Sequence, residues 1–162
     1  MRKITNLSHR TAFTVVGKDR LSVLQGLVTQ DLNLLKIGHM AYALMLTSHG
    51  KFFCDMFIVS MPDFIILDVD ASQRDQIIRK IEMFRLRSDL EIMENDTWFV
   101  GSSSLKIDGN SKERLCFLDP RTKEMGFRVY SKNAMEDDPN LLKSYHEKRF
   151  SLALSEGVCL LY

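Results

Sequence analysis

Apolar side chains follow a strand-like pattern in four segments of the first hundred residues. Residues 11–16, 39–46, 52–61 and 64–69 are rich in apolar side chains and are bounded by glycine, proline or small polar residues. Such runs predict β-strands. The short run TSHG at 47–50 separates two of them. A turn-forming interruption of this kind predicts a β-hairpin.

Two other segments show helical spacing. After Asp19, leucine and valine recur at positions 21, 24, 27 and 28, in steps of three and four residues. Residues 72–84 repeat this pattern with isoleucine and phenylalanine, and Ser72 followed by Asp75 resembles a capping box. We therefore expect one helix from Asp19 onward and a second over residues 72–84.

Shorter apolar runs at 90–93 and 98–100 predict two more strands on either side of a turn at 94–96. The resulting order is strand, helix, three strands, helix, two strands. This order predicts an α+β fold in which two helices pack on one antiparallel sheet, close to the ferredoxin-like arrangement.

The composition changes after residue 100. Residues 101–114 are rich in serine, lysine and glycine, which predicts a linker or a long surface loop. Beyond it we expect strands around 115–130 and a helix over about 141–154. We therefore divide the chain into a first lobe, residues 1–102, and part of a second lobe, residues 103–162. The end, CLLY at 159–162, is mostly apolar, so we expect it either to dock onto the sheet or to mark a chain cut short.

Bulk properties exclude some classes of function. The 22 basic and 21 acidic residues leave a net charge of +1, which argues against a nucleic-acid partner. No run approaches the roughly 18 apolar residues of a membrane span. The first residues also lack the apolar stretch of a signal peptide, so we expect a cytoplasmic protein without a membrane partner.

Cysteine and histidine do not form a pattern that binds metal. The chain has three cysteines and four histidines, with no CxxC, HxxxH or mixed cluster. We therefore expect no metal site. Cys54 and Cys116 are expected to be small buried side chains rather than reactive thiols, and no histidine has a visible partner that would make it a catalytic base.

Several motifs resemble folate binders related to the glycine-cleavage T-protein. Residues 16–19 (VGKD) and 24–32 (LQGLVTQDL) are similar to the opening block of that superfamily, and residues 46–55 (LTSHGKFFCD) are similar to its hairpin. Residues 84–92 (FRLRSDLEI), and DPR with GFR within 119–128, resemble the YgfZ-type branch, which supports iron–sulfur cluster assembly.

The resemblance implies a tetrahydrofolate site. In it, Asp55 contacts the ligand, Thr29, Gln30 and Asp31 supply hydrogen-bonding groups after the first helix, and Arg87 contacts the glutamate of folate. The residues alone allow plainer interpretations. Asp55 could face solvent, the loop residues could terminate a helix, and Arg87 could complement the helix dipole.

Two further expectations concern charged residues in strands. With simple alternation, Phe53, Asp55 and Phe57 share one face of their strand, where a buried carboxylate is costly unless it accepts hydrogen bonds. We expect the charged residues of the DPR and GFR motifs to form a structural ion pair across a turn rather than a ligand contact.

The resemblance implies a folate-binding accessory protein, without a catalytic residue of its own, that works with iron–sulfur assembly proteins. Two departures matter. The adjacent aspartates of the aminomethyltransferases are replaced by Cys54 and Asp55, and the K-G-C-Y-x-G-Q-E motif of the YgfZ-type branch is absent, as in an N-terminal portion. The alternatives are a tetrahydrofolate-dependent aminomethyltransferase and a protein-interaction or RNA-binding domain. The latter lacks the expected basic and aromatic surface pattern.

Overall fold

The computed structural model describes residues 4–157, so the predicted docking of residues 159–162 lies outside the described residues. Its strands are β1 (Thr5–Asn6), β2 (Arg10–Val16), β3 (His39–Leu46), β4 (Phe52–Ser60), β5 (Ile65–Asp70), β6 (Glu91–Ser103), β7 (Arg114–Leu118) and β8 (Phe127–Ser131). Its α-helices are α1 (Arg20–Gln25), α2 (Arg74–Arg85) and α3 (Pro139–Ser151). Short 3-10 turns are η1 (Leu32–Leu34), η2 (Ala71–Gln73) and η3 (Lys123–Met125).

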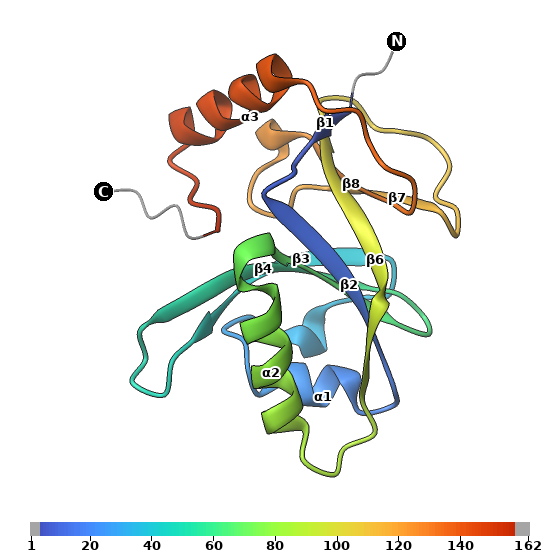
Figure 1. Ribbon diagram of the computed structural model, residues 1–162, viewed down its shortest axis with the longest axis vertical. Helices are drawn as coiled ribbons and strands as arrows, with labels where there is room; N and C mark the ends of the chain where they lie inside the picture. The colour runs from blue at the N-terminus through green and yellow to red at the C-terminus, as the bar shows by residue number, and fades with distance from the viewer. Residues whose placement is uncertain (1–3, 158–162) are drawn as a thin grey trace.

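All strands join one curled antiparallel sheet in the order β3-β4-β5-β2-β6-β8-β7, with β1 beside β6. Helices α1 and α2 lie on one side of the sheet and α3 on the opposite side (Figure 1). The predicted α+β fold with an antiparallel sheet is therefore confirmed. The predicted hairpin is also present as β3 and β4.

Strand β6 corrects one prediction. Residues 94–96 do not separate two short strands, because β6 runs without interruption from Glu91 to Ser103. The register against β2 shifts between Phe13 and Thr14, where Phe13 pairs with Thr97 but Thr14 pairs with Met93. A β-bulge absorbs the polar residues without ending the strand. The second half of β6 pairs with β8, so this strand belongs to both parts of the sheet.

The predicted linker at 101–114 also begins later than expected, because β6 continues to Ser103. The loop that follows protects the outer edge of β7, since Asn110 Oδ1 accepts a hydrogen bond of 2.9 Å from the Cys116 N–H. The division into two lobes at residue 102 stays a prediction, at the end of a strand that both parts share.

The capping box predicted at Ser72 and Asp75 is not formed. The residue before α2 is Gln73, whose side chain makes no capping bond. Asp70 instead accepts from the Ser72 N–H at 2.9 Å and starts the preceding 3-10 turn. At its other end, α2 stops at Leu86, which has φ 49° and ψ −109°, a backbone conformation that strains a side chain with a Cβ.

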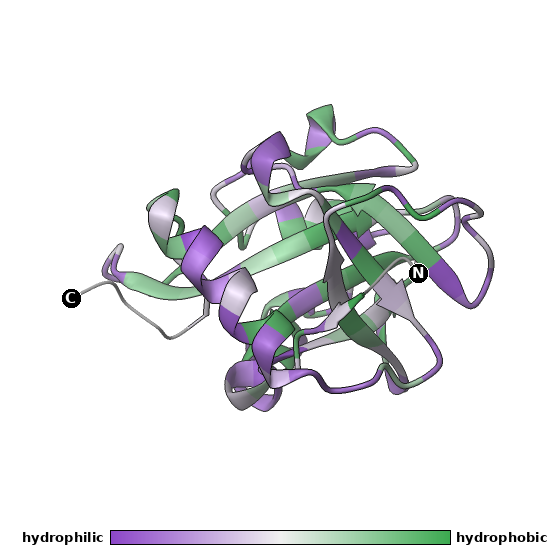
Figure 2. Cartoon of the chain, turned by 90° about the horizontal axis from the view of Figure 1, so that it is seen from above, coloured by the Kyte–Doolittle hydropathy of each residue, from purple (hydrophilic) through white to green (hydrophobic). Residues whose placement is uncertain are grey.

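Two apolar cores lie on opposite faces of the sheet. One packs α1 and α2 through residues such as Leu24, Ile77 and Ile81. The other packs α3 and the curled end of the sheet around Trp98 and Tyr130. The strands are largely hydrophobic and the helices carry much of the hydrophilic colour (Figure 2). The second core also holds a network of charged side chains, described next.

Candidate functional site

A surface cleft of about 510 Å³ lies beside the edge strand β3. It is lined by Gln30 and Asp31 of the loop after α1, by Tyr42 of β3, and by Pro120 with Arg121. The remaining lining residues are Leu34, Leu35, Lys36, His39, Met40 and Ala41. Pockets of 300–1,000 Å³ with mixed apolar and polar walls are typical of small-molecule sites.

Tyr42 connects this cleft to the interior. Its Oη donates a hydrogen bond of 3.0 Å to Asp55 Oδ2, and partial burial together with this carboxylate raises the pKa of the phenol. Tyr42 therefore stays protonated and can only donate to Asp55. A group bound in the cleft would be one side chain away from that carboxylate.

Asp55 is buried in β4, with 2% of its side chain exposed. Its Oδ1 accepts from Arg10 Nη1 at 2.8 Å and from the Gly157 N–H at 3.1 Å. These donors offset the cost of burying a carboxylate. The prediction that Phe53, Asp55 and Phe57 share one face of the strand is partly wrong. A bulge opposite Leu46 turns Phe53 toward the helix-side core, so only Asp55 and Phe57 share a face.

Asp68 lies at the centre of a wider ion network. It accepts from Arg10 Nε at 2.8 Å, from Arg128 Nε at 2.7 Å and from Tyr130 Oη at 3.0 Å. Its side chain is fully buried. Burial alone would raise the pKa of Asp68, but Arg128 and Arg10 outweigh it and lower the pKa. Asp68 is therefore ionised at neutral pH and lies between two buried cations.

Glu156 forms a second centre of this network. Its Oε2 accepts from Tyr145 Oη at 2.6 Å and lies 3.0 Å from Arg121 Nη1 and 3.2 Å from Arg128 Nη1. Its Oε1 lies 2.9 Å from His9 Nε2. The carboxylate is fully buried although it comes from the segment after α3.

The Phe57 ring supports the cations of the network. The guanidinium carbons of Arg128, Arg121 and Arg10 lie 3.7, 4.7 and 5.6 Å from its centroid. Such cation–π contacts favour arginine over an aromatic face, most of all where water is excluded. Because Arg121 also lines the cleft, the network is continuous with the cleft wall.

The structure brings together some of the residues named by the sequence. Gln30 and Asp31 line the cleft, and Asp55 lies behind Tyr42. Thr29 instead secures the edge of β3, since its Oγ1 accepts from the Leu44 N–H at 3.0 Å. Arg87 does not reach the cleft and lines a separate hollow after α2, with Asp19, Leu86 and Ser88.

The ion pair expected across the 119–128 turn is only partly as predicted. Arg121 does pair with Asp119, through two bonds of 2.7 and 3.0 Å. Arg128, however, does not pair with Asp119 and bonds instead to Asp68 and Glu156. The sequence analysis did not assign Arg10, Asp68 or Glu156 to the site. A charged residue inside an apolar strand, as in IILDVD at 65–70, was the signal for Asp68.

Cys54 is buried on the helix-side face of β4, and burial followed by the nearby Asp55 raises the pKa of its thiol to about 12. Within residues 4–157, no group of three histidine, cysteine or acidic residues could hold a metal ion. In the same range, no helix is long and apolar enough to cross a membrane.

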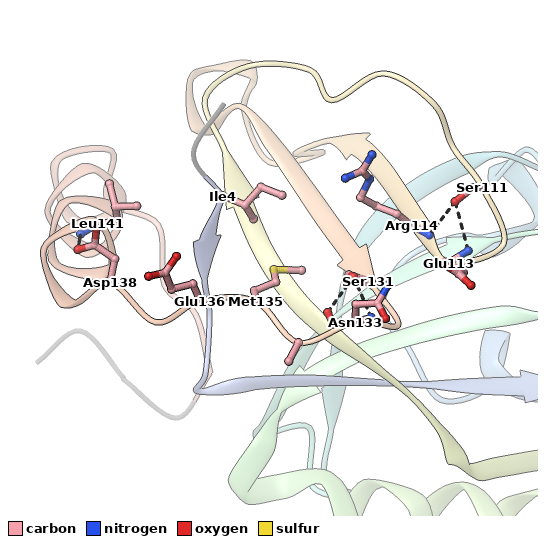
Figure 3. A pocket seen from close by; sticks show the side chains of 11 residues that line it. Ile4, Ser111, Glu113, Arg114, Ser131, Asn133, Met135, Glu136, Asp138 and Leu141 are labelled. Atoms are coloured by element: carbon pink, nitrogen blue, oxygen red, sulfur yellow. Dashed lines mark hydrogen bonds between the residues drawn. The ribbon is translucent and has the colours of Figure 1, made fainter. Parts of the chain in front are cut away.

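A further hollow, of about 690 Å³, is lined by residues near β1, at the start of α3 and along β7 and β8 (Figure 3). Ile4 and Met135 contribute apolar surface to it, and Arg114 and Glu136 contribute charged groups. None of the residues predicted for the ligand lines it, so the cleft at Tyr42 is the better candidate site.

Comparisons with known proteins identify one matching family model and several similar proteins. A protein-family model described as the GCVT N-terminal domain matches residues 2–101. The chain is 27% identical over 143 residues to "Iron-sulfur cluster assembly factor IBA57 homolog, mitochondrial" of Mycosarcoma maydis, covering 78% of this chain and 35% of the relative. It is 30% identical over 90 residues to "Aminomethyltransferase" of Clostridium botulinum, covering 55% of this chain and 24% of the relative.

The fold is also similar to a solved structure. The glycine cleavage system aminomethyltransferase T from Bartonella henselae matches with a TM-score of 0.64 at 14% identity, covering 95% of this chain and 47% of that chain. The chain thus spans less than half the length of each of these relatives.

Proposed function

The chain belongs to the family of GCVT N-terminal domains, and from this premise we propose that it binds a tetrahydrofolate and supports iron–sulfur cluster assembly. One observation carries the proposal. Gln30 and Asp31, named from the motifs alone, line the same cleft as Tyr42, which is hydrogen-bonded to Asp55.

The residues present fit such a ligand. Gln30 and Asp31 offer a carboxamide and a carboxylate to a polar heterocycle, and Leu34, Leu35 and Pro120 offer apolar wall to its ring. Arg121 supplies positive charge, which suits a ligand that carries carboxylates. A bound tetrahydrofolate supplies reduced nitrogens that carry one-carbon groups, whereas the protein side chains bind and orient it.

The accessory role is supported by the similarity to iron–sulfur assembly factors over most of this chain. The partners would then be folate and proteins of iron–sulfur cluster assembly. This chain alone should not restore iron–sulfur enzyme activity in cells that lack such a factor, because it does not contain the K-G-C-Y-x-G-Q-E motif. Rescue of these cells by this chain would contradict that expectation.

Aminomethyl transfer is the second candidate, favoured by the 30% identity to an aminomethyltransferase. Asp55 is an unsuitable base for it in this structure, because the carboxylate is ion-paired with Arg10 and also accepts from Tyr42 and Gly157. Turnover of an aminomethyl donor by the purified chain would favour transfer over the accessory role.

The binding proposal is tested by thermal unfolding with increasing 5-formyltetrahydrofolate. A ligand that binds only the folded chain raises the unfolding midpoint as its concentration rises. Loss of one hydrogen bond in Gln30→Ala should weaken binding by about two- to tenfold.

Arg87→Ala is the matched control, because Arg87 is exposed and lies outside the cleft. It should bind like the wild type. No midpoint shift at millimolar ligand, or loss of binding in Arg87→Ala alone, would rule out the cleft as the folate site.

A further inference from the structure

The buried ion network has one carboxylate more than its arginines require. Asp55 pairs with Arg10, Asp68 pairs with both Arg10 and Arg128, and Asp119 pairs with Arg121. These three aspartates already match the three arginines in charge. Glu156 is therefore an additional anion, held against Arg121 and Arg128.

Two polar atoms near Glu156 also lack a hydrogen-bond partner among the described residues. Arg128 Nη2 and His9 Nδ1 are buried and make no hydrogen bond within residues 4–157, although both side chains already bond to Glu156 through another nitrogen. Buried polar atoms without a partner are uncommon in proteins, and each of them calls for an explanation. Arg128 therefore keeps one further N–H group that an oxyanion could accept from.

The segment that carries Glu156 is short and enters the network from outside the sheet. Arg121 Nη1 donates to the Ser155 carbonyl at 3.3 Å, and the Gly157 N–H donates to Asp55. Gly157 has φ +68°, and a Cβ there would lie 2.4 Å from Asp70 Oδ2, so only glycine fits this close approach. Residues 155–157 therefore occupy hydrogen-bonding positions on both Asp55 and the arginines that a ligand would otherwise be able to use.

We propose that residues 155–157 are the internal occupant of an oxyanion-binding site, and that a carboxylate of the bound ligand displaces Glu156 from Arg121 and Arg128. Arg121 joins this site to the cleft at Tyr42, so a ligand in the cleft can reach it. Displacement also withdraws the Gly157 N–H from Asp55 and opens that carboxylate to the ligand. This inference rests on the proposed function, because it assigns the ligand to the same cleft.

Hydrogen exchange of the wild-type chain tests the displacement directly. With saturating 5-formyltetrahydrofolate, which carries two carboxylates, the backbone amides of residues 152–157 should exchange faster than without it. Amides of β4 and β5 should be unchanged or slower. This measurement does not depend on whether any variant folds.

Titration calorimetry of Glu156→Gln provides the second readout. The substitution removes the competing charge and leaves three arginines with three aspartates, so the ligand should bind about tenfold more tightly or better. Glu147→Gln is the matched control, because Glu147 is on α3 with 65% of its side chain exposed. Its affinity should equal that of the wild type.

The outcomes separate the two proposals. Ligand binding with unchanged or slower exchange at 152–157, or with equal or weaker affinity in Glu156→Gln, overturns the displacement and leaves the folate proposal intact. No ligand-dependent heat, exchange or midpoint change in any of these proteins defeats the proposed function, and the displacement with it.

Discussion

Replacing Asp68 by asparagine should destabilise the protein more than any surface charge change. The carboxylate is fully buried between Arg10 and Arg128, at 2.8 and 2.7 Å. Asparagine keeps the shape but removes the charge, and its NH₂ group must then face a guanidinium. Removing one partner of a buried ion pair costs about 3–5 kcal/mol.

For a chain of this size each kcal/mol lowers the unfolding midpoint by about 2–4 °C. The midpoint of Asp68→Asn should therefore fall by about 6–20 °C. Such a loss is a large share of the roughly 5–15 kcal/mol that stabilises a typical domain. The assay is urea unfolding followed by circular dichroism, with a thermal scan alongside.

The control is Asp75→Asn, which breaks an ion pair with Arg74 in which the Asp75 side chain is 78% exposed. Exposed pairs contribute less than about 1 kcal/mol, so this variant should match the wild type. If Asp68→Asn lost no more than Asp75→Asn, the network would not be the source of stability argued above.

Three further predictions concern other parts of the molecule. Burial would raise the pKa values of Asp68 and Glu156, but the adjacent arginines, and for Glu156 also His9, lower both, so their stabilisation is complete above about pH 5 and is lost as pH falls through the lowered values. Urea midpoints that stay constant from pH 5 to pH 2 would contradict this. Leu86→Gly should raise the thermal midpoint by about 2–4 °C, because glycine accepts the strained φ of 49°; a lower midpoint would show that the leucine side chain matters more than its strain. Cys54, with a thiol pKa of about 12 caused first by burial, should resist iodoacetamide at pH 8 until the chain unfolds, and peptide mass spectrometry of the native protein would reveal any exception.

The local pattern was enough to predict most strands and helices. Residues 39–46 and 52–61 are rich in apolar side chains and are separated by a turn-forming run, so residues close together in the sequence are enough to predict the hairpin. The continuous β6 was missed because its polar residues 94–96 are typical of a turn. Only pairing with Phe13 and Thr14, far away in sequence, turns them into a bulge.

In the candidate site, too, local motifs predicted some residues and missed those that depend on distant contacts. Gln30 and Asp31 follow a helix in a motif, and the motif alone assigned them to a ligand-binding loop. The ion network joins residues that are distant along the chain, such as Arg128 and Asp68, 60 positions apart. No local rule pairs one buried charge with a particular distant partner, because the topology of the curled sheet decides which strands face each other.

This separation has a consequence for how the chain is made. A ribosome adds about 5–20 residues per second, so the 60 positions between Asp68 and Arg128 take about 3–12 s to appear. During that interval Asp68 has Arg10 as its only arginine partner in the network, and Glu156 is still later. The N-terminal strands therefore emerge before two of the charged partners in the network, Arg128 and Glu156, have been made. The buried ion network is complete only after Glu156 has been added.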